Sequence, residues 1–389
     1  MVNLKNLMYN IVMLKIKPDQ LLSKNIENTL IVDIRNSASF SYGHINNAIN
    51  LNETQLETFL TKNFNKETIV YCDNGEKSAK IIKNARKNRK NIAYLEGGYN
   101  NYILWQIEKD ISTNKNVDIE LSIRKKFHKV LFSKFCEALN TYELIKPNDK
   151  IAVCISGGKD SFLMAKLFQE LKRHNKFHFE LVFLVMDPGY SIKNRKIIEF
   201  NAKMLNIPIK IFKTNIFESV LNIAKSPCYL CARMRRGHLY NKAKQLGCNK
   251  IALGHHFDDV IETILMSMLY GAQIQTMMPK LKSANFDGME LIRPMYLIRE
   301  KDIQHWRDYN ELNFLQCACK FTEDIANNNE ANTNLSSKRA KIKELIKVLK
   351  NDDPQIEQNI FKSVENVNLA TIIKYKDKNN DLHNFLDEY

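Results

Sequence analysis

The stretch from Ile151 to Ser161 constrains the fold of this chain more than any other. Five apolar residues, Ile151–Ile155, predict a buried β-strand, and Ser156–Ser161 (Ser-Gly-Gly-Lys-Asp-Ser) leads directly into an amphipathic helix. The glycines let the backbone approach a ligand closely, and the helix start supplies unpaired N–H groups and a positive dipole end. The Walker pattern Gly-x4-Gly-Lys-Ser/Thr is absent. The stretch therefore predicts a phosphate-binding turn of another kind.

The composition suits a soluble globular protein of two or three domains. The chain has 389 residues, of which 44% are hydrophobic and 26% charged. It has no apolar run of the roughly 18 residues that a membrane span needs, and Met1–Met13 lacks a signal-peptide pattern. We therefore expect a cytoplasmic protein whose eight cysteines stay reduced. The net charge of +15 suits a polyanionic partner such as RNA, although a generally lysine-rich proteome would produce the same excess.

The first third of the chain predicts a small parallel α/β domain. Apolar runs at Leu30–Ile34, Thr68–Cys72 and Asn91–Leu95 alternate with helical segments. Cys72 ends the second run and is followed by the tight loop Asp73–Ser78, which enters a helix. A cysteine at such a position is expected to ionise readily, so it could accept a sulfane sulfur and carry it as a persulfide. The alternative is a buried cysteine at a strand end.

These motifs resemble a single rhodanese domain. The family pattern Val-Asp-x-Arg is met at Val32–Arg35, and Gly-His-Ile-x-x-Ala-x-Asn at Gly43–Asn50. The active loop Cys-x-x-Gly-x-Arg-Ser is met by Cys72, Gly75 and Ser78, with Lys77 in place of arginine. We assign residues 14–110 to this domain. The polar residues that follow predict a linker over 111–119.

The rest of the chain predicts a doubly wound sheet. Residues Leu121–Leu139 predict a basic amphipathic helix. Its charged face either contacts RNA or is simply solvated, and the sequence leaves both roles open. Further buried strands are expected at Glu180–Met186, Asn206–Phe212 and Lys250–Gly254. Ligands bind beyond the carboxyl ends of parallel strands in such sheets. The residues expected there, beside Ser156, Gly157, Gly158, Lys159, Asp160 and Ser161, are Asp187, Gly254, His255 and Asp258.

Two groups of cysteines predict a metal site. Cys228 and Cys231 form a Cys-x-x-Cys pair, and Cys317-Ala-Cys319 lies further along the chain. Because Cys-x-Cys is awkward for two ligands of one tetrahedral metal, one of the later two is expected to ligate. Three cysteine ligands suit an iron–sulfur cluster with one open iron. A structural zinc ion or an unmetallated dithiol remains the alternative.

The motifs at 156–161, 228–237, 252–259 and 292–294 resemble, in order, those of the tRNA 2-thiocytidine synthetases, a family of N-type ATP pyrophosphatases. The resemblance implies ATP, Mg²⁺ and a 4Fe-4S cluster as cofactors, with Asp160 contacting the Mg²⁺. It matches Cys228 and Cys231 to the first two cluster ligands. The family has Cys-x-x-Cys at the third position, where this chain has Cys-x-Cys, and we favour Cys317 over Cys319.

Taken together, the sequence predicts an α/β protein of two parallel-sheet domains that thiolates tRNA with ATP. Residues 120–322 form the second domain, and 323–389 a helical, partly disordered tail. We expect Cys72 to pass sulfur from a persulfide donor, such as a cysteine desulfurase, through the cluster to an adenylated anticodon-loop cytidine, with release of AMP and pyrophosphate. The alternatives are thiolation of another base or small molecule, an amine-joining enzyme of the same ATP chemistry, and an RNA-binding protein with a structural metal. A homodimer is left open.

Overall fold

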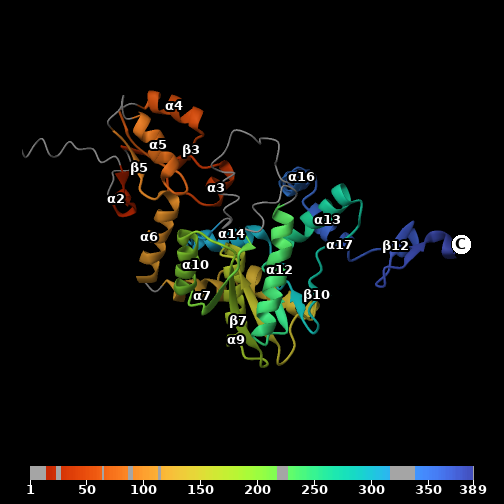
Figure 1. Cartoon of the computed structure of the whole chain (residues 1–389). Coiled ribbons are helices and arrows are strands. Elements are labelled where there is room, and N and C mark those ends of the chain that lie inside the picture. The colour runs from red at the N-terminus through yellow and green to blue at the C-terminus, as the bar shows by residue number, and fades with distance from the viewer. Residues whose placement is uncertain are drawn as a thin grey trace, which may run out of the picture.

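The computed structural model describes residues 15–22, 28–63, 65–85, 91–112, 115–216, 227–315 and 338–388. Two parallel sheets, each with helices on its faces, make up most of this part of the chain (Figure 1). The expected α/β fold with two such sheets is confirmed. Among the described residues, no helix combines the length and the apolar character needed to cross a membrane.

The first sheet has five parallel strands in the order β1-β5-β4-β2-β3. Its central strand β4 is apolar because both faces are covered, and Ile69, Val70 and Tyr71 are fully buried. The sequence predicts Cys72 as the last residue of this strand, and in the structure it comes directly after β4. The elements are β1 (Lys15–Ile16), α2 (Pro18–Leu22), β2 (Thr29–Asp33), α3 (Ser37–Tyr42), β3 (Ala48–Asn50), α4 (Glu53–Lys62), β4 (Glu67–Tyr71), α5 (Glu76–Ala85), β5 (Ile92–Leu95) and α6 (Gly98–Ser112).

The second sheet has six strands in the order β10-β11-β9-β6-β7-β8, all parallel except the edge strand β10. Strand β6 lies in the middle, so the phosphate loop that follows it opens at the centre of the carboxyl edge. The elements are β6 (Lys150–Ile155), α9 (Lys159–Arg173), β7 (Glu180–Asp187), α10 (Ile192–Met204), β8 (Ile209–Lys213), α12 (Pro227–Gln245), β9 (Lys250–Ala252), α13 (Phe257–Gly271), β10 (Lys280–Lys282), β11 (Glu290–Ile292) and α14 (Glu300–Tyr309).

The two sheets are joined by packed helices rather than by an extended linker. Helix α6 of the first part packs against α10 of the second (Figure 1). Ile103 and Ile107 of α6 belong to the same buried cluster as Ile197 of α10. The expected linker 111–119 is helical at both ends, because α6 continues to Ser112 and α7 begins at Asn116.

The basic helix expected over Leu121–Leu139 is interrupted. The structure has α7 (Asn116–Arg124), a π-helical turn η2 (His128–Phe132) and α8 (Ser133–Thr141). At the break, the ring of Phe127 is buried edge-on against His305 and Tyr309 of α14, with centroids 5.1 and 5.6 Å away. This contact with a distant helix is invisible to the local pattern.

The C-terminal tail, which was expected to be partly helical, contains two helices that pack on the second part of the chain. Helices α16 and α17 pack on α13 (Figure 1). Ile342 and Ile346 of α16 and Phe361 of α17 are buried with Phe257 and Val260 of α13. These helices therefore belong to the core of the second part. The remaining elements are α16 (Lys338–Asp352), α17 (Ile356–Ser363), η3 (Leu369–Thr371), the antiparallel pair β12 (Lys374–Lys376) and β13 (Leu382–Asn384), and η4 (Phe385–Glu388).

Candidate nucleotide and sulfur-transfer sites

The loop after β6 has the form of a phosphate-binding turn. Gly157 has φ +98°, a conformation that glycine adopts without strain. Ser161 ties the turn together, since its hydroxyl accepts the Ser156 N–H at 3.2 Å and donates to the Gly158 carbonyl at 2.9 Å. Gly158 is the N-cap of α9, so the start of this helix and its positive dipole end lie at the turn. These features fit the phosphates of ATP.

A cavity of about 360 Å³ opens at this loop. The ends of β6, β7 and β9 meet there with one side of α12 and the start of α13, the place where doubly wound sheets bind ligands. The lining residues are Cys154, Ile155, Ser156, Asp160, Ser161, Met186, Arg235, Arg236, Leu239, Leu253, Gly254, His255 and Asp259.

The structure brings five of the ten predicted nucleotide residues to this cavity: Ser156, Asp160, Ser161, Gly254 and His255. Gly254 packs closely on the phosphate loop, since a Cβ atom there would lie 3.3 Å from the backbone of Asp160 and Ser161. His255 contributes a neutral imidazole: burial, and then the nearby Arg293, lower its pKa to about 4, and its Nδ1 accepts a 3.3 Å hydrogen bond from Arg293. Gly254 and His255 therefore form one wall beside the phosphate loop.

Two predicted residues have other contacts. Asp187 accepts hydrogen bonds from the backbone N–H groups of Gly189 and Tyr190 at 3.0 and 2.8 Å, which shapes the turn after β7. Asp258 accepts the N–H of Glu300 at 2.6 Å and so fixes the start of α14. In place of Asp187 and Asp258, their neighbours Met186 and Asp259 line the cavity.

Lys159 points toward α14. Its buried ammonium lies 3.1 Å from Asp160 and 3.2 Å from Glu300. Burial opposes ionisation of Glu300, but Lys159 and then Lys343 outweigh it and lower the pKa of Glu300 to about 2. The loop lysine is thus held by two carboxylates in this structure.

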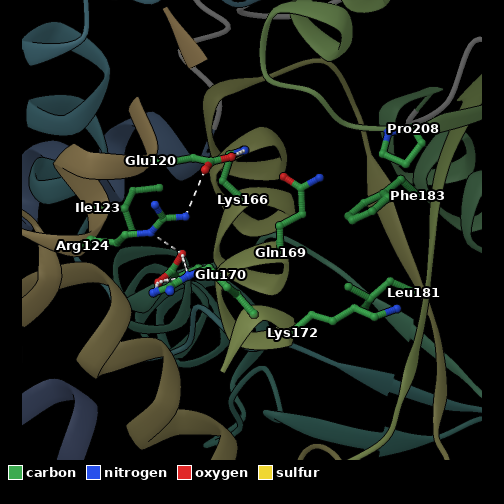
Figure 2. Close-up of a pocket in the computed structure, with 11 residues that line it drawn as sticks. Glu120, Ile123, Arg124, Lys166, Gln169, Glu170, Lys172, Leu181, Phe183 and Pro208 are labelled. Atoms are coloured by element: carbon green, nitrogen blue, oxygen red, sulfur yellow. Dashed lines mark hydrogen bonds and ion pairs between the residues drawn. The ribbon is translucent and has the colours of Figure 1, made fainter. Parts of the chain in front are cut away.

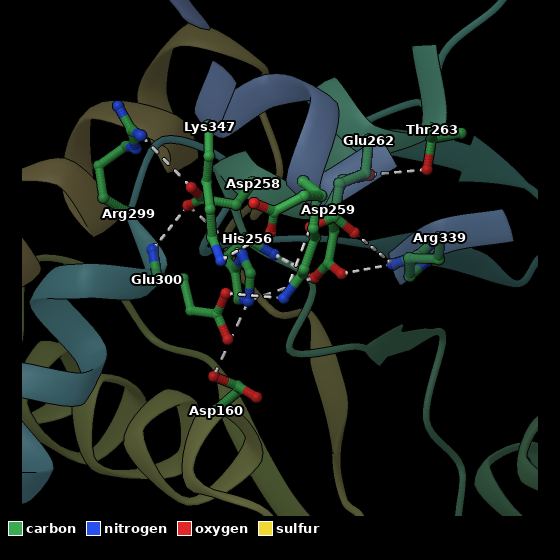
Figure 3. Close-up of polar contacts among 12 residues, drawn as sticks. Asp160, His256, Asp258, Asp259, Glu262, Thr263, Arg299, Glu300, Arg339 and Lys347 are labelled. Atoms are coloured by element: carbon green, nitrogen blue, oxygen red, sulfur yellow. Dashed lines mark hydrogen bonds and ion pairs between the residues drawn. The ribbon is translucent and has the colours of Figure 1, made fainter. Parts of the chain in front are cut away.

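Helix α16 adds two cations to this region that sequence reasoning missed: Arg339, which Figure 3 labels, and Lys343. Arg339 Nη1 lies 2.7 Å from Asp259, and Lys343 Nζ lies 2.9 Å from Glu300. Both also approach the buried Glu262 of α13, at 3.3 and 3.5 Å. The available signal was their four-residue spacing in a basic helix, which puts both on one face.

Helix α12 connects the cavity with the Cys-x-x-Cys pair. Its first turn contains Cys228 and Cys231, and Arg235 and Arg236 one turn later line the cavity. The two positions are three apart in a helix, a spacing that suits a shared ligand. Cys317 and Cys319 lie outside the described residues, as do the side chains of Cys228 and Cys231. Within the described part, no group of His, Cys, Asp or Glu side chains has the arrangement of a metal site.

Cys72 lies in a compact loop of the first part. Its sulfur accepts the N–H of Ser78 at 3.5 Å, at the start of α5, and the Ser78 hydroxyl is also 3.5 Å away. Gly98 packs under the loop with φ +63°, and a Cβ atom there would lie 2.3 Å from the Cys72 carbonyl oxygen. Lys77, which replaces the family's arginine, pairs with Glu53 at 2.5 Å.

A second cavity, of about 480 Å³, lies between α7, α9 and β7 (Figure 2). At its wall the buried ammonium of Lys166 donates to Glu120 at 2.7 Å, to the Leu205 carbonyl at 3.0 Å and to Asn116 at 3.1 Å. With three acceptors its hydrogen-bonding capacity is filled. We therefore interpret this lysine as a structural tie between α7 and α9.

Comparison with known proteins separates the chain into the same two parts. Residues 127–334 match the model of the PP-loop domain, and residues 18–104 match that of the rhodanese-like domain. A tRNA-cytidine(32) 2-sulfurtransferase from Neisseria meningitidis serogroup C is 37% identical over 46% of this chain and 57% of its own length. The chain thus spans somewhat more than half of that relative.

Other relatives are covered more fully. The tRNA-cytidine(32) 2-sulfurtransferase of Syntrophotalea carbinolica is 32% identical over 59% of this chain and 86% of its own length. Among solved structures, the U34-tRNA thiolase NcsA from Methanococcus maripaludis with its 4Fe-4S cluster has a TM-score of 0.46 at 20% identity, over 60% of this chain and 76% of its own. The chain belongs to the PP-loop family, with tRNA-cytidine(32) 2-sulfurtransferases among its relatives, and carries a rhodanese-like domain ahead of its PP-loop domain.

Proposed function

We propose that this protein uses ATP to replace the 2-oxygen of a tRNA cytidine with sulfur. The observation that supports this most is that one cavity joins the phosphate loop to α12, the helix that begins at the Cys-x-x-Cys pair. The ATP site and the candidate sulfur site would then lie along the same helix, α12. The names of the relatives supply the substrate, cytidine 32 of tRNA.

In the first step, ATP activates the base. The 2-carbonyl oxygen of the cytosine base attacks the α-phosphorus of ATP. The bond between this phosphorus and the oxygen that bridges to the β-phosphate breaks, and pyrophosphate leaves. The N–H groups at the start of α9 and the hydroxyl of Ser156 would hold the departing phosphates, and Asp160 would contact Mg²⁺. His255, kept neutral by burial and Arg293, adds no charge and offers a hydrogen bond to the nucleotide.

In the second step, sulfur attacks the activated carbon and AMP leaves with the former base oxygen. We propose that Cys72 carries the incoming sulfur as a persulfide received from a donor such as a cysteine desulfurase, stabilised by the N–H of Ser78. Cleaving its S–S bond to the sulfide level takes two electrons, which a dithiol reductant supplies.

The remaining cofactor would be a 4Fe-4S cluster, which Cys228, Cys231 and Cys317 would hold. Cys228 and Cys231 stand three positions apart at the start of α12, a spacing at which two cysteines can share one cluster. When bound, it supplies an open iron that can hold sulfide near the cavity. Arg235 and Arg236, on the same helix, would meet tRNA phosphates, and the cytoplasm remains the expected compartment.

The test is anaerobic incubation of the full chain with tRNA, ATP, Mg²⁺ and sulfide. We expect AMP and 2-thiocytidine in equal amounts, measured by chromatography of nucleotides and mass spectrometry of tRNA nucleosides, and neither product without tRNA. Failure of tRNA to elicit AMP release would contradict the proposal and favour an RNA-binding protein. If AMP is released and a different thiolated nucleoside is found, the proposed chemistry stands and only the assignment of the modified base changes.

A further inference from the structure

Helix α16 lies outside the segments whose motifs predict chemistry, yet it meets the nucleotide site through two ion pairs. Arg339 contacts Asp259 at 2.7 Å, and Lys343 contacts Glu300 at 2.9 Å. Figure 3 shows Arg339 of α16 reaching the carboxylates of Asp259 and Glu262 on α13. Helix α16 therefore lies beside the nucleotide site, although it is far from the phosphate loop in the sequence.

One of the two carboxylates lines the nucleotide cavity, and the other contacts the lysine of the phosphate loop. Asp259 lines the cavity itself and also accepts the N–H of His256 at 3.1 Å. Glu300 holds Lys159, the first helical residue after the glycines, at 3.2 Å. Arg339 therefore contacts the cavity wall through Asp259. Lys343 is connected to the phosphate loop through Glu300 and Lys159.

Packing fixes the position of α16, while the side chains of Arg339 and Lys343 are 40% and 44% exposed. Ile342 lies between them in the sequence of α16 and is 1% exposed, and Ile346 is 6% exposed. Both pack into the apolar cluster that contains Phe257 and Val260 of α13. A charged side chain anchored by a buried neighbour loses less conformational entropy on pairing than one on a free surface. The helix thus presents its charges at set positions.

Without α16, three carboxylates would face one another at this point. Asp259, Glu262 and Glu300 lie on α13 and α14, and Glu262 is only 2% exposed. Like charges in a partly buried site repel strongly, and a polyphosphate would add further negative charge. Arg339 and Lys343 compensate these carboxylates before the anionic nucleotide arrives.

We infer that α16 is a working part of the ATP site, in which Arg339 and Lys343 are positioning residues that neutralise and orient Asp259 and the Glu300–Lys159 pair. The inference rests on the proposed function, because it takes ATP to be the ligand of the phosphate loop. It adds that binding of ATP depends on a helix from the C-terminal part of the chain.

Methionine substitutions of the two cations test this. Arg339→Met and Lys343→Met keep side-chain length and helix propensity while removing the charge. The matched control is Lys347→Met, one turn further along α16, where the side chain is 73% exposed and pairs with Glu344 on its own helix. Arg339→Lys restores the charge and serves as the rescue. The probe is ATP with Mg²⁺, titrated calorimetrically into the full chain without tRNA.

We expect Arg339→Met and Lys343→Met each to raise the Kd for ATP about tenfold, equivalent to about 1.4 kcal/mol. Arg339→Lys should recover most of the affinity, and Lys347→Met should match the wild type. The losses should shrink as salt is added, because screening weakens the repulsion. A purely structural role for α16 would instead lower the thermal midpoint and leave the Kd unchanged well below that midpoint.

The outcomes separate this inference from the proposed function. If the wild type binds ATP and both methionine variants bind it equally well, or if Lys347→Met weakens binding as much as they do, the inference is wrong and the proposed function is untouched. A wild type that does not bind ATP would overturn both. Weakened binding in the two variants, with no AMP release on adding tRNA, would uphold the inference and reject the thiolation step.

Discussion

The backbone N–H of Leu315 donates a 3.2 Å hydrogen bond to the carbonyl oxygen of Gly157. The side chains of Leu315 and of Ile198 of α10 both pack at this glycine, where an added Cβ atom would lie 3.4 Å from Leu315. The phosphate loop is therefore enclosed by two segments that both follow it in the sequence. Leu315 is also the last described residue before the part of the chain that contains Cys317 and Cys319.

Gly157→Ala should destabilise the protein by about 1–3 kcal/mol, because alanine is strained at φ +98°. A Cβ atom would also lie 2.9 Å from Ile198. The matched control is Gly158→Ala, where φ is −86° and the nearest atom, the Leu315 carbonyl oxygen, would be 3.5 Å away. Thermal unfolding without ATP should show a lower midpoint for the first variant alone. Equal midpoints for the two would contradict the enclosed-loop description.

Cys72→Ser should abolish sulfur transfer from a persulfide donor while ATP-dependent activation of tRNA continues. A hydroxyl cannot form the persulfide, and the nucleotide cavity lies in the other domain. Labelled sulfur in tRNA and AMP release measure the two activities separately. Cys136→Ser, a half-buried cysteine on α8, serves as the control and should retain both. Undiminished labelling in the Cys72→Ser protein would remove Cys72 from the pathway.

Anaerobically purified protein should contain about four iron and four sulfide per chain, with a broad visible absorption. Serine at Cys228, Cys231 or Cys317 should remove most of the iron, and Cys319→Ser should leave it. Chelation of the iron should stop thiolation without preventing ATP binding. Stoichiometric zinc without iron would contradict the cluster, and iron loss from Cys319→Ser rather than Cys317→Ser would reverse the ligand assignment.

Glu262 should make stability fall as the pH rises. Burial raises its pKa to about 7, although Lys343 and Arg339 oppose the rise; Asp259 and Glu300 add to it. Because the folded state holds this proton more tightly than the unfolded state, stability decreases from about pH 4.5 to about pH 7. Glu262→Gln removes the ionisation, so it should stabilise the protein by about 1–2 kcal/mol at pH 8 and change little at pH 4.5.

Thermal midpoints across this pH range provide the measurement, with a rise of a few degrees at pH 8 expected for Glu262→Gln. Glu344→Gln, an exposed glutamate on α16, is the matched control and should follow the wild type. A Glu262→Gln curve parallel to that of the wild type would show that this carboxyl does not titrate in the range.

Local patterns predicted the strands and the phosphate loop well. The expected strand Ile151–Ile155 lies within β6, and the expected helix begins at Lys159. Buried parallel strands are continuous apolar runs, which makes them visible in sequence. The break at Phe127 could not be foreseen, because the contacts that favour it come from α14. The packing of the C-terminal part could not be foreseen for the same reason, since Ile342 and Ile346 are buried against α13, which is distant in the sequence.

The candidate site divides in the same way. The sequence alone determined that a Ser-Gly-Gly-Lys-Asp-Ser turn follows a buried strand and that cysteines stand at three places around it, because backbone freedom, helix starts and thiol chemistry are local properties. Only the tertiary structure decided that Asp259 rather than Asp258 lines the cavity, and that Arg339 and Lys343 compensate the carboxylates behind it. Electrostatic compensation depends on distance in space, and the phosphate loop and α16 become neighbours only when the chain folds.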